Sequence, residues 1–145
     1  MGDTKSILIS VKRLSNKMQR LLSNLQVSRG EEALTGMQCG VLVFIREYSK
    51  TSDVFQKDIE KEFNIRGSTA TGILQLMEKN NLIERVPVDY DARLKKIILT
   101  EKGINTREEV DQWNLETEKR LTKNLTPDEI ETFLALIDKI SKGLD

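Results

Sequence analysis

Residues 56–80 constrain the fold more than any other part of the chain. Their apolar spacing predicts a short amphipathic helix over 56–63. A four-residue turn, 64–67, ends in glycine, and a second helix is predicted over 68–80 with Ser68 as its N-cap. Two short helices joined by a tight, glycine-containing turn are the pattern of a helix-turn-helix motif.

A β-hairpin is predicted directly after this motif. Two β-type runs lie at 82–86 and 97–100, and residues 87–96 between them are predicted as a polar loop too long for a tight turn. Residues 53–55 could add a very short strand before the first helix of the motif. A helix-turn-helix followed by a hairpin with a charged tip predicts a winged helix, whose tip can reach DNA beside the groove that the second helix occupies.

Helices with apolar seams flank the winged segment. A helix is predicted over 5–27, where apolar residues recur at spacings of four and three, and another over 35–49. The seam residues of the first helix are Ile7, Val11, Leu14, Met18, Leu21 and Leu25. Such a seam packs either in the core of a monomer or against a second subunit.

Two further helices are predicted after the hairpin, over 104–123 and from Thr126 to the end of the chain. Thr126 as N-cap, a proline after it and Glu129 at the capping-box position mark the start of the last helix. Its seam again repeats at three and four, through Ile130, Phe133, Ile137, Ile140 and Leu144.

The predicted fold is therefore mainly α with a small β-wing. Residues 1–34 are predicted as an N-terminal dimerisation helix and linker, and residues 35–103 as a winged helix-turn-helix DNA-binding domain. Residues 104–145 are predicted as C-terminal dimerisation helices.

Charge and residue usage exclude several classes of function. Twenty-three basic and 23 acidic residues give a net charge of zero, so any DNA binding must rest on a local patch. One cysteine and no histidine leave no intrachain disulfide and no zinc site of the usual kind, and no nucleophile or phosphate loop indicates an enzyme or a cofactor. The single cysteine fits a reducing cytoplasm. Residues 1–30 mix charged and apolar positions, unlike a signal peptide or a membrane span.

Four short motifs of the winged segment occur in an order and spacing typical of a known family. They are Ser68-Thr69-Ala70-Thr71, Leu82-Ile83-Glu84-Arg85, Asp91-Ala92-Arg93 and Leu99-Thr100-Glu101-Lys102-Gly103. Through them the chain resembles the MarR family of bacterial transcription regulators, and the flanking helices extend the resemblance over nearly the whole chain. The third and fourth motifs are the specific ones, since a helix-turn-helix alone is common.

The resemblance implies a homodimer, with an interface made by the terminal helices, that binds pseudo-palindromic double-stranded DNA. It also implies a repressor that releases the DNA on binding a small, often aromatic, effector. Gly72 and Leu76 stand where the family often has basic residues, and Ala92 where it often has arginine. Fewer cations imply fewer phosphate contacts and a shallower salt dependence of DNA binding.

The candidate DNA-binding residues on the second helix share its exposed face. Helical angles place Ser68, Gly72, Gln75 and Lys79 there, with Thr69 and Thr71 on the flanks. Gln75 is predicted to read an adenine edge, and the threonines to contact a thymine methyl or a phosphate. Gly72 permits close approach of the helix backbone to DNA or, alternatively, relieves crowding within the protein.

The remaining candidates lie before that helix and on the wing. Arg93 is predicted to enter a narrow minor groove, with Asp91 holding its side chain by an ion pair. Lys95 and Lys96 are predicted either to contact phosphates or to be ordinary solvated residues at the end of a strand, and Arg66 is similarly placed for a phosphate. Cys39 is interpreted as a small buried core residue. The alternative function for the chain is a winged-helix protein-interaction module with weak or lost DNA binding.

Overall fold

The computed structural model describes residues 6–23 and 34–145, which form six helices and one two-stranded antiparallel sheet. In chain order the elements are α1 (Ile7–Ser23), α2 (Gly36–Tyr48), α3 (Gln56–Phe63), α4 (Gly67–Lys79), β1 (Ile83–Val88), β2 (Asp91–Leu99), α5 (Glu101–Thr122) and α6 (Pro127–Lys142). The predicted fold, mainly α with a β-wing, is confirmed. The chain divides into two compact units, Met1–Trp113 and Asn114–Asp145, with the boundary inside α5.

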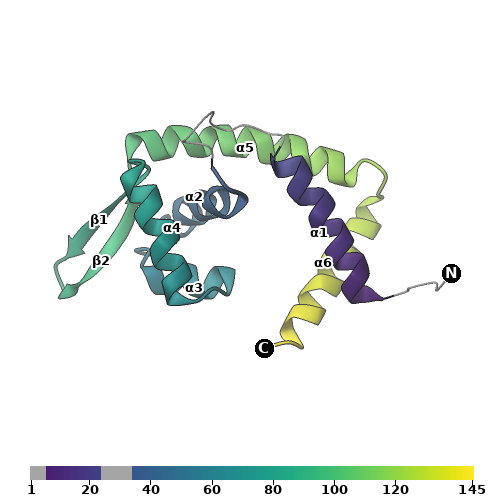
Figure 1. The fold of residues 1–145 in the computed structure, drawn as a ribbon, viewed down its shortest axis with the longest axis horizontal. Coiled ribbons are helices and arrows are strands. Elements are labelled where there is room, and N and C mark those ends of the chain that lie inside the picture. The colour runs from purple at the N-terminus through teal and green to yellow at the C-terminus, as the bar shows by residue number, and fades with distance from the viewer. Residues whose placement is uncertain (1–5, 24–33) are drawn as a thin grey trace. The chain divides into compact units, whose positions relative to one another are not determined.

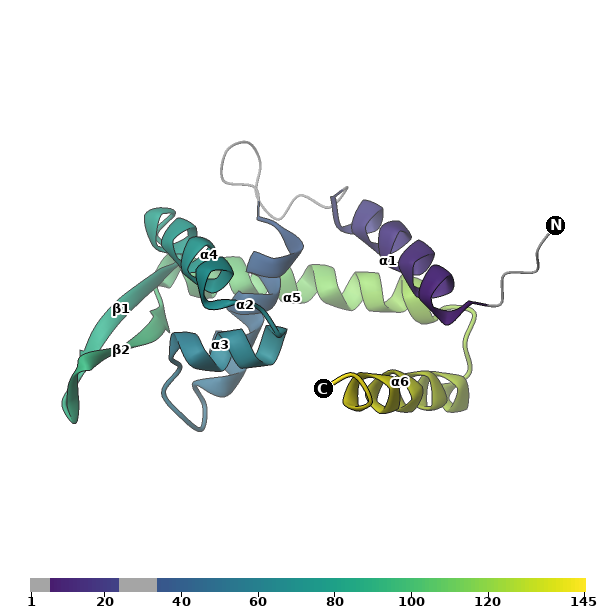
Figure 2. The same ribbon diagram turned by 60° about the horizontal axis from the view of Figure 1, so that its bottom comes forward.

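The core of the first unit lies where the helix-turn-helix meets the wing. Figures 1 and 2 show α2, α3 and α4 gathered together, with the hairpin extending away from them. The three helices α2, α3 and α4 contribute side chains that are almost fully removed from water. The two strands and α5 do so as well. The largest are Leu42, Ile45, Ile59, Leu74, Met77, Ile83, Ile97 and Val110. Burial of their apolar surface is the main favourable term that fixes α4 and the wing on one scaffold.

Two of the predicted helix starts are confirmed, each by a reciprocal capping box. The Thr35 hydroxyl accepts from the Gln38 amide at 3.2 Å, and the Gln38 side chain accepts from the Thr35 amide at 3.1 Å. Thr126 and Glu129 make the same exchange at the start of α6. Such a box satisfies amides that the first turn of a helix leaves without intrahelical partners. The described part of the first predicted helix is α1, and Leu25 lies outside the described residues.

The predicted N-cap of α4 is wrong. Asn64 adopts a left-handed conformation, with φ of 49°, and the Ile65 amide donates to the Glu60 carbonyl at 3.0 Å. This tight ending of α3 shortens the turn, so that α4 begins at Gly67 with Arg66 as its N-cap. Ser68 therefore lies inside the first helical turn, where its side chain is exposed.

The predicted polar loop over 87–96 is also wrong, because most of it is strand. β1 and β2 pair from Ile83↔Leu99 to Val88↔Asp91, with an irregularity at Pro87 and Val88, and only Asp89 and Tyr90 form the tip. Apart from the buried Val88, this outer hairpin is largely exposed, so its strands are held mainly by backbone hydrogen bonds and hydropathy gives no alternating signal.

The short strand considered at 53–55 is not formed. Val54 is buried instead, and its carbonyl accepts a single hydrogen bond from the Ile97 amide at 2.7 Å. An ion pair of 3.7 Å between Lys96 and Asp53 lies beside it. These two contacts fasten the base of the wing to the segment that leads into α3.

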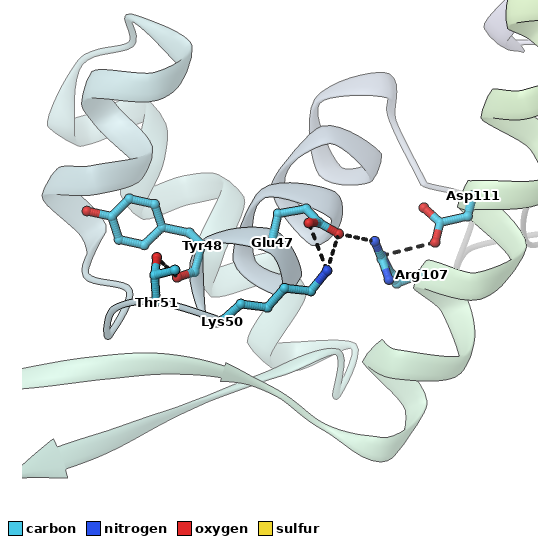
Figure 3. Close-up of polar contacts among 6 residues, drawn as sticks. All are labelled: Glu47, Tyr48, Lys50, Thr51, Arg107 and Asp111. Carbon is cyan, nitrogen blue, oxygen red and sulfur yellow. Dashed lines mark hydrogen bonds and ion pairs between the residues drawn. The ribbon is translucent and has the colours of Figure 1, made fainter.

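A charged cluster joins the end of α2 to α5 within the first unit (Figure 3). The Glu47 carboxylate accepts from Arg107 at 2.7 Å and from Lys50 at 3.0 Å, and Arg107 lies 3.2 Å from Asp111. Lys50 first, and then Arg107, hold the pKa of Glu47 below its usual range. Because the Arg107 side chain is only 14% exposed, this cation is shielded from solvent more than an ordinary surface ion pair would be.

Strand β2 turns into α5 through a close backbone approach at Gly103. The Thr100 hydroxyl donates to the Asn81 carbonyl at 2.6 Å and accepts from the Gly103 amide at 3.0 Å. The Thr100 amide donates to the Leu82 carbonyl at 3.1 Å. A Cβ atom at Gly103 would overlap that same Leu82 carbonyl oxygen. The motif over 99–103 thus joins the end of α4, the wing and α5 at one point, and it requires glycine there.

We expect Gly103→Ala to lower the free energy of unfolding by about 1–3 kcal/mol, because backbone must move to admit the methyl group. Gly72→Ala is the matched control, since a Cβ at Gly72 meets nothing within 4 Å and alanine favours helix by roughly 1 kcal/mol. Urea unfolding followed by circular dichroism measures both. Equal stability of the wild type and Gly103→Ala would contradict the packing described at this junction.

Candidate nucleic-acid interface

Helix α4 separates an apolar inner face from a polar outer one. Ala70, Leu74 and Met77 are fully buried against the rest of the first unit. The outward-facing residues are Ser68, Thr69, Gly72, Gln75, Leu76 and Lys79, all of them exposed. The helix carries no acidic residue from Gly67 to Met77, and Glu78 near its end lies 4.0 Å from Arg85 of β1. Short, uncharged side chains and a lysine therefore dominate the face that α4 presents to solvent.

Gly72 lies at the centre of that face and has no internal reason to be glycine. A Cβ atom built there meets no heavy atom within 4 Å, so the interpretation that Gly72 relieves crowding within the protein is wrong. Glycine in a helix interior costs roughly 1 kcal/mol relative to alanine. The described residues show no intramolecular contact that offsets this cost.

Thr71 is engaged within the protein and only half exposed. The Gln56 side-chain amide donates to the Thr71 hydroxyl at 3.0 Å and to the Gly67 carbonyl at 3.2 Å. Gln56 thus fixes the angle between α3 and α4 from the first residue of α3. Sequence reasoning missed Gln56, because a hydrogen bond between polar residues of two helices leaves no periodic signal. Thr71 acts as a positioning residue in this arrangement, unlike the freely exposed Thr69.

The wing presents Arg93 close to its tip. The Arg93 side chain is 92% exposed, and its Nε lies 3.4 Å from the Asp91 carboxylate. The same carboxylate oxygen accepts from the Arg93 backbone amide at 2.9 Å. The ion pair predicted between these two residues is therefore present, and the backbone contact adds to it. Arg93 lies in the stretch of β2 between Asp91 and Lys95, where the pairing with β1 is irregular.

The other predicted cations differ in their surroundings. Arg66 and Lys79 are exposed at opposite ends of α4, and neither makes an ion pair within the part of the chain that the structure describes. Lys95 is exposed on the wing, whereas Lys96 pairs with Asp53. The structure thus gathers Ser68, Thr69, Gly72, Gln75 and Lys79 on one helical face, and Asp91, Arg93 and Lys95 on the separate wing.

Other kinds of site find less support in the described ranges, 6–23 and 34–145. No three His, Cys, Asp or Glu residues come together there as metal ligands. None of the helices in those ranges has the length and apolarity needed to cross a bilayer. Cys39 is buried in the core as interpreted from the sequence, and this burial raises the pKa of its thiol. A thiol in that environment is a poor nucleophile.

Comparison with known proteins places this geometry in context. The sequence pattern of the MarR family matches residues 34–94. An uncharacterized HTH-type transcriptional regulator of Bacillus subtilis, YwhA, is 33% identical over 86 residues, which cover 59% of this chain. The match spans 62% of the length of that regulator.

Solved structures of regulators share the fold over almost the whole chain. The S. aureus MepR–DNA complex is 23% identical, with a TM-score of 0.86 over 99% of this chain and 100% of the other. PcaV from Streptomyces coelicolor, solved with its natural ligand, is 17% identical, with a TM-score of 0.85 over 100% and 98%. This shared fold confirms the winged helix-turn-helix predicted from the sequence, and the match over residues 34–94 agrees with the predicted resemblance to the MarR family of regulators.

Proposed function

We propose that this chain regulates transcription by binding double-stranded DNA in a sequence-specific manner through residues 35–103. The observation that carries the proposal is the outer face of α4, which combines an open glycine, short polar side chains and no acid over Gly67–Met77. A helix of this kind can enter the major groove and bring its exposed side chains to the base edges. The structural relative MepR was solved as a complex with DNA.

Direct reading of bases is assigned to the centre of α4 and phosphate binding to its ends. Gln75 can form two hydrogen bonds with an adenine edge, while Ser68 and Thr69 offer hydroxyl groups beside it. Arg66 before the helix and Lys79 at its end supply charge for the phosphates on either side of the groove. Thr71 supports this surface through its hydrogen bond with Gln56.

The wing is assigned to the adjacent minor groove. Asp91 constrains the Arg93 backbone and side chain before DNA is bound, so less conformational entropy is lost on binding. A single arginine in a narrow minor groove gains from the enhanced negative potential there. Lys95, exposed on the same strand, is assigned to a phosphate.

Arg93→Ala should weaken duplex binding by roughly tenfold or more at moderate salt, because both wings of a dimer lose a groove contact. Fluorescence anisotropy with a labelled duplex measures this. Lys50→Ala is the control, since it also removes one exposed cation, but from the ion-pair cluster with Glu47. Unchanged affinity of Arg93→Ala would rule out the wing contact.

The working form of the protein is proposed to be a homodimer. The helix α6 exposes a broad apolar face that includes Phe133, Leu134, Ile137 and Ile140, and α1 exposes its own seam residues Ile7, Val11 and Leu14. Large apolar residues exposed at helical spacing along each of these two helices are typical of helices that pair with another subunit. Two protomers would also present two reading helices to the two halves of a pseudo-palindromic operator.

Replacing Ile137 by aspartate should convert the dimer to a monomer, because the carboxylate would have to be buried in the apolar interface. Light scattering after size-exclusion chromatography gives the mass of each species. Lys139→Asp introduces the same residue on the opposite face of α6 and should leave the dimer intact. A wild type that is monomeric at every concentration would contradict the dimer itself.

We also propose that the protein is a cytoplasmic repressor that a small aromatic effector releases from DNA. The supporting observation is Trp113 of α5, whose buried indole N–H has no hydrogen-bond partner among the described residues. Buried donors are normally paired, so a ligand that carries an acceptor would satisfy this group. The structural relative PcaV was solved with its natural ligand, which supports the same kind of control.

Trp113 is the only tryptophan of the chain, so its fluorescence reports directly on this site. Titration with simple phenols and benzoates should change the emission with saturation and weaken duplex binding over the same concentration range. Trp113→Phe removes the indole N–H and should lower the affinity for the effector while leaving DNA binding intact. If no compound of the series affects DNA binding, a simple phenol or benzoate as effector is ruled out.

A further inference from the structure

Gly72 forms the floor of a small open notch on the outer face of α4. In a helix, the side chains three and four residues away on either side are the neighbours of a given position. At Gly72 these neighbours are Ser68, Thr69, Gln75 and Leu76, and all four are exposed. Since a Cβ at Gly72 would meet nothing within 4 Å, the space between them is empty. We call Gly72 and these four neighbours the Gly72 notch.

The notch has one apolar wall and one polar wall. By helical angle, Leu76 and Thr69 lie on one side of Gly72, and Gln75 and Ser68 lie on the other. Leu76 is 46% exposed and is the only large apolar side chain on the outer face of α4. An aliphatic side chain cannot bind a phosphate or donate to a base edge, so its partner in a groove has to be apolar.

We propose that the Gly72 notch binds the C5-methyl group of a thymine in each half-site of the operator. This inference rests on the proposed function, in which α4 occupies the major groove. The thymine methyl is the one apolar group that the four bases present there. The missing side chain at Gly72 admits the methyl close to the helix backbone, and Leu76 with the methyl of Thr69 covers it on one side.

Charge and geometry around the notch fit this occupant. The stretch Gly67–Met77 carries no acid that would repel the DNA backbone, and the cations Arg66 and Lys79 flank it at the two ends of α4. On the polar wall, Gln75 is placed to bind an adenine next to the thymine. The notch therefore favours a base step in which a thymine methyl group lies next to the hydrogen-bond donor and acceptor of an adenine.

The test begins with the full chain and a random duplex pool, from which bound duplexes are selected and sequenced. Each thymine of the best site is then replaced in turn by deoxyuridine, which removes only the methyl group. For the wild type we expect one thymine per half-site at which this change weakens binding by about fourfold, the effect of withdrawing one methyl from an apolar contact. Thymines elsewhere should show no change.

Two variants of α4 separate the notch from general binding. Leu76→Ala should bring the ratio of thymine to deoxyuridine affinity at that position close to one. Lys79→Ala, on the same face but outside the notch, should weaken binding to both duplexes equally and keep the ratio. Thermal unfolding of both variants checks that the fold is retained, as expected for exposed positions.

The outcomes distinguish this inference from the function on which it rests. If duplexes are selected but deoxyuridine is tolerated at every position, or if Leu76→Ala keeps the full preference for thymine, the notch proposal is overturned and DNA binding stands. If no duplex is bound above background, the proposed function itself fails, and the notch proposal fails with it.

Discussion

The contact between Gly103 and the Leu82 carbonyl is the constraint on which the rest of this structure depends. At this point the end of α4, the base of β1, the end of β2 and the start of α5 are within hydrogen-bonding distance of one threonine, Thr100. A side chain at Gly103 would separate them. Because α4 and the wing meet here, their relative orientation is set by close backbone contacts and by the short Thr100 side chain that bridges them.

The outward surfaces follow from that rigid junction. The core formed by α2, α3, α4 and the strands leaves one face of α4 without any internal role, and the Gln56 hydrogen bonds fix the tilt of that face. The wing carries its arginine on a strand whose position is fastened by Val54 and Asp53 at the base. Because the net charge is zero, the proposed DNA binding depends on the placement of a few cations and not on a strong overall electrostatic field.

Sequence patterns predicted the helices that bury one face. They failed where backbone conformation and backbone hydrogen bonds decide where an element begins or ends. Apolar spacing gave α2, α3, α4 and α6, and the capping residues Thr35 and Thr126 are as their types suggest. Ser68 was misplaced as a cap because the left-handed Asn64 shortens the turn before it. The outer wing was predicted as a loop because Val88 is the only buried residue over 87–96, and hydropathy cannot report on pairing that the backbone maintains.

For the candidate site, the sequence identified the exposed residues but not the residues that position them through hydrogen bonds. The face of α4 and the Asp91–Arg93 pair could be predicted from helical angles and from the wing motif. The bond between Gln56 and Thr71 could not, since it joins residues far apart in sequence without an apolar pattern. Whether Gly72 relieved crowding was also undecidable without coordinates, because it depends on the space around one absent atom.

The central claim is that this chain regulates transcription by binding DNA. The salt dependence of duplex binding tests this claim most directly. Affinity for a duplex is measured by anisotropy over a range of salt concentrations, and its logarithm is plotted against the logarithm of salt. We expect a linear fall whose slope is no steeper than about −7. This limit corresponds to one phosphate contact from each of four cations in both protomers, namely Arg66, Lys79, Arg93 and Lys95. A flat plot would contradict the account and favour a winged-helix module that binds protein instead of DNA.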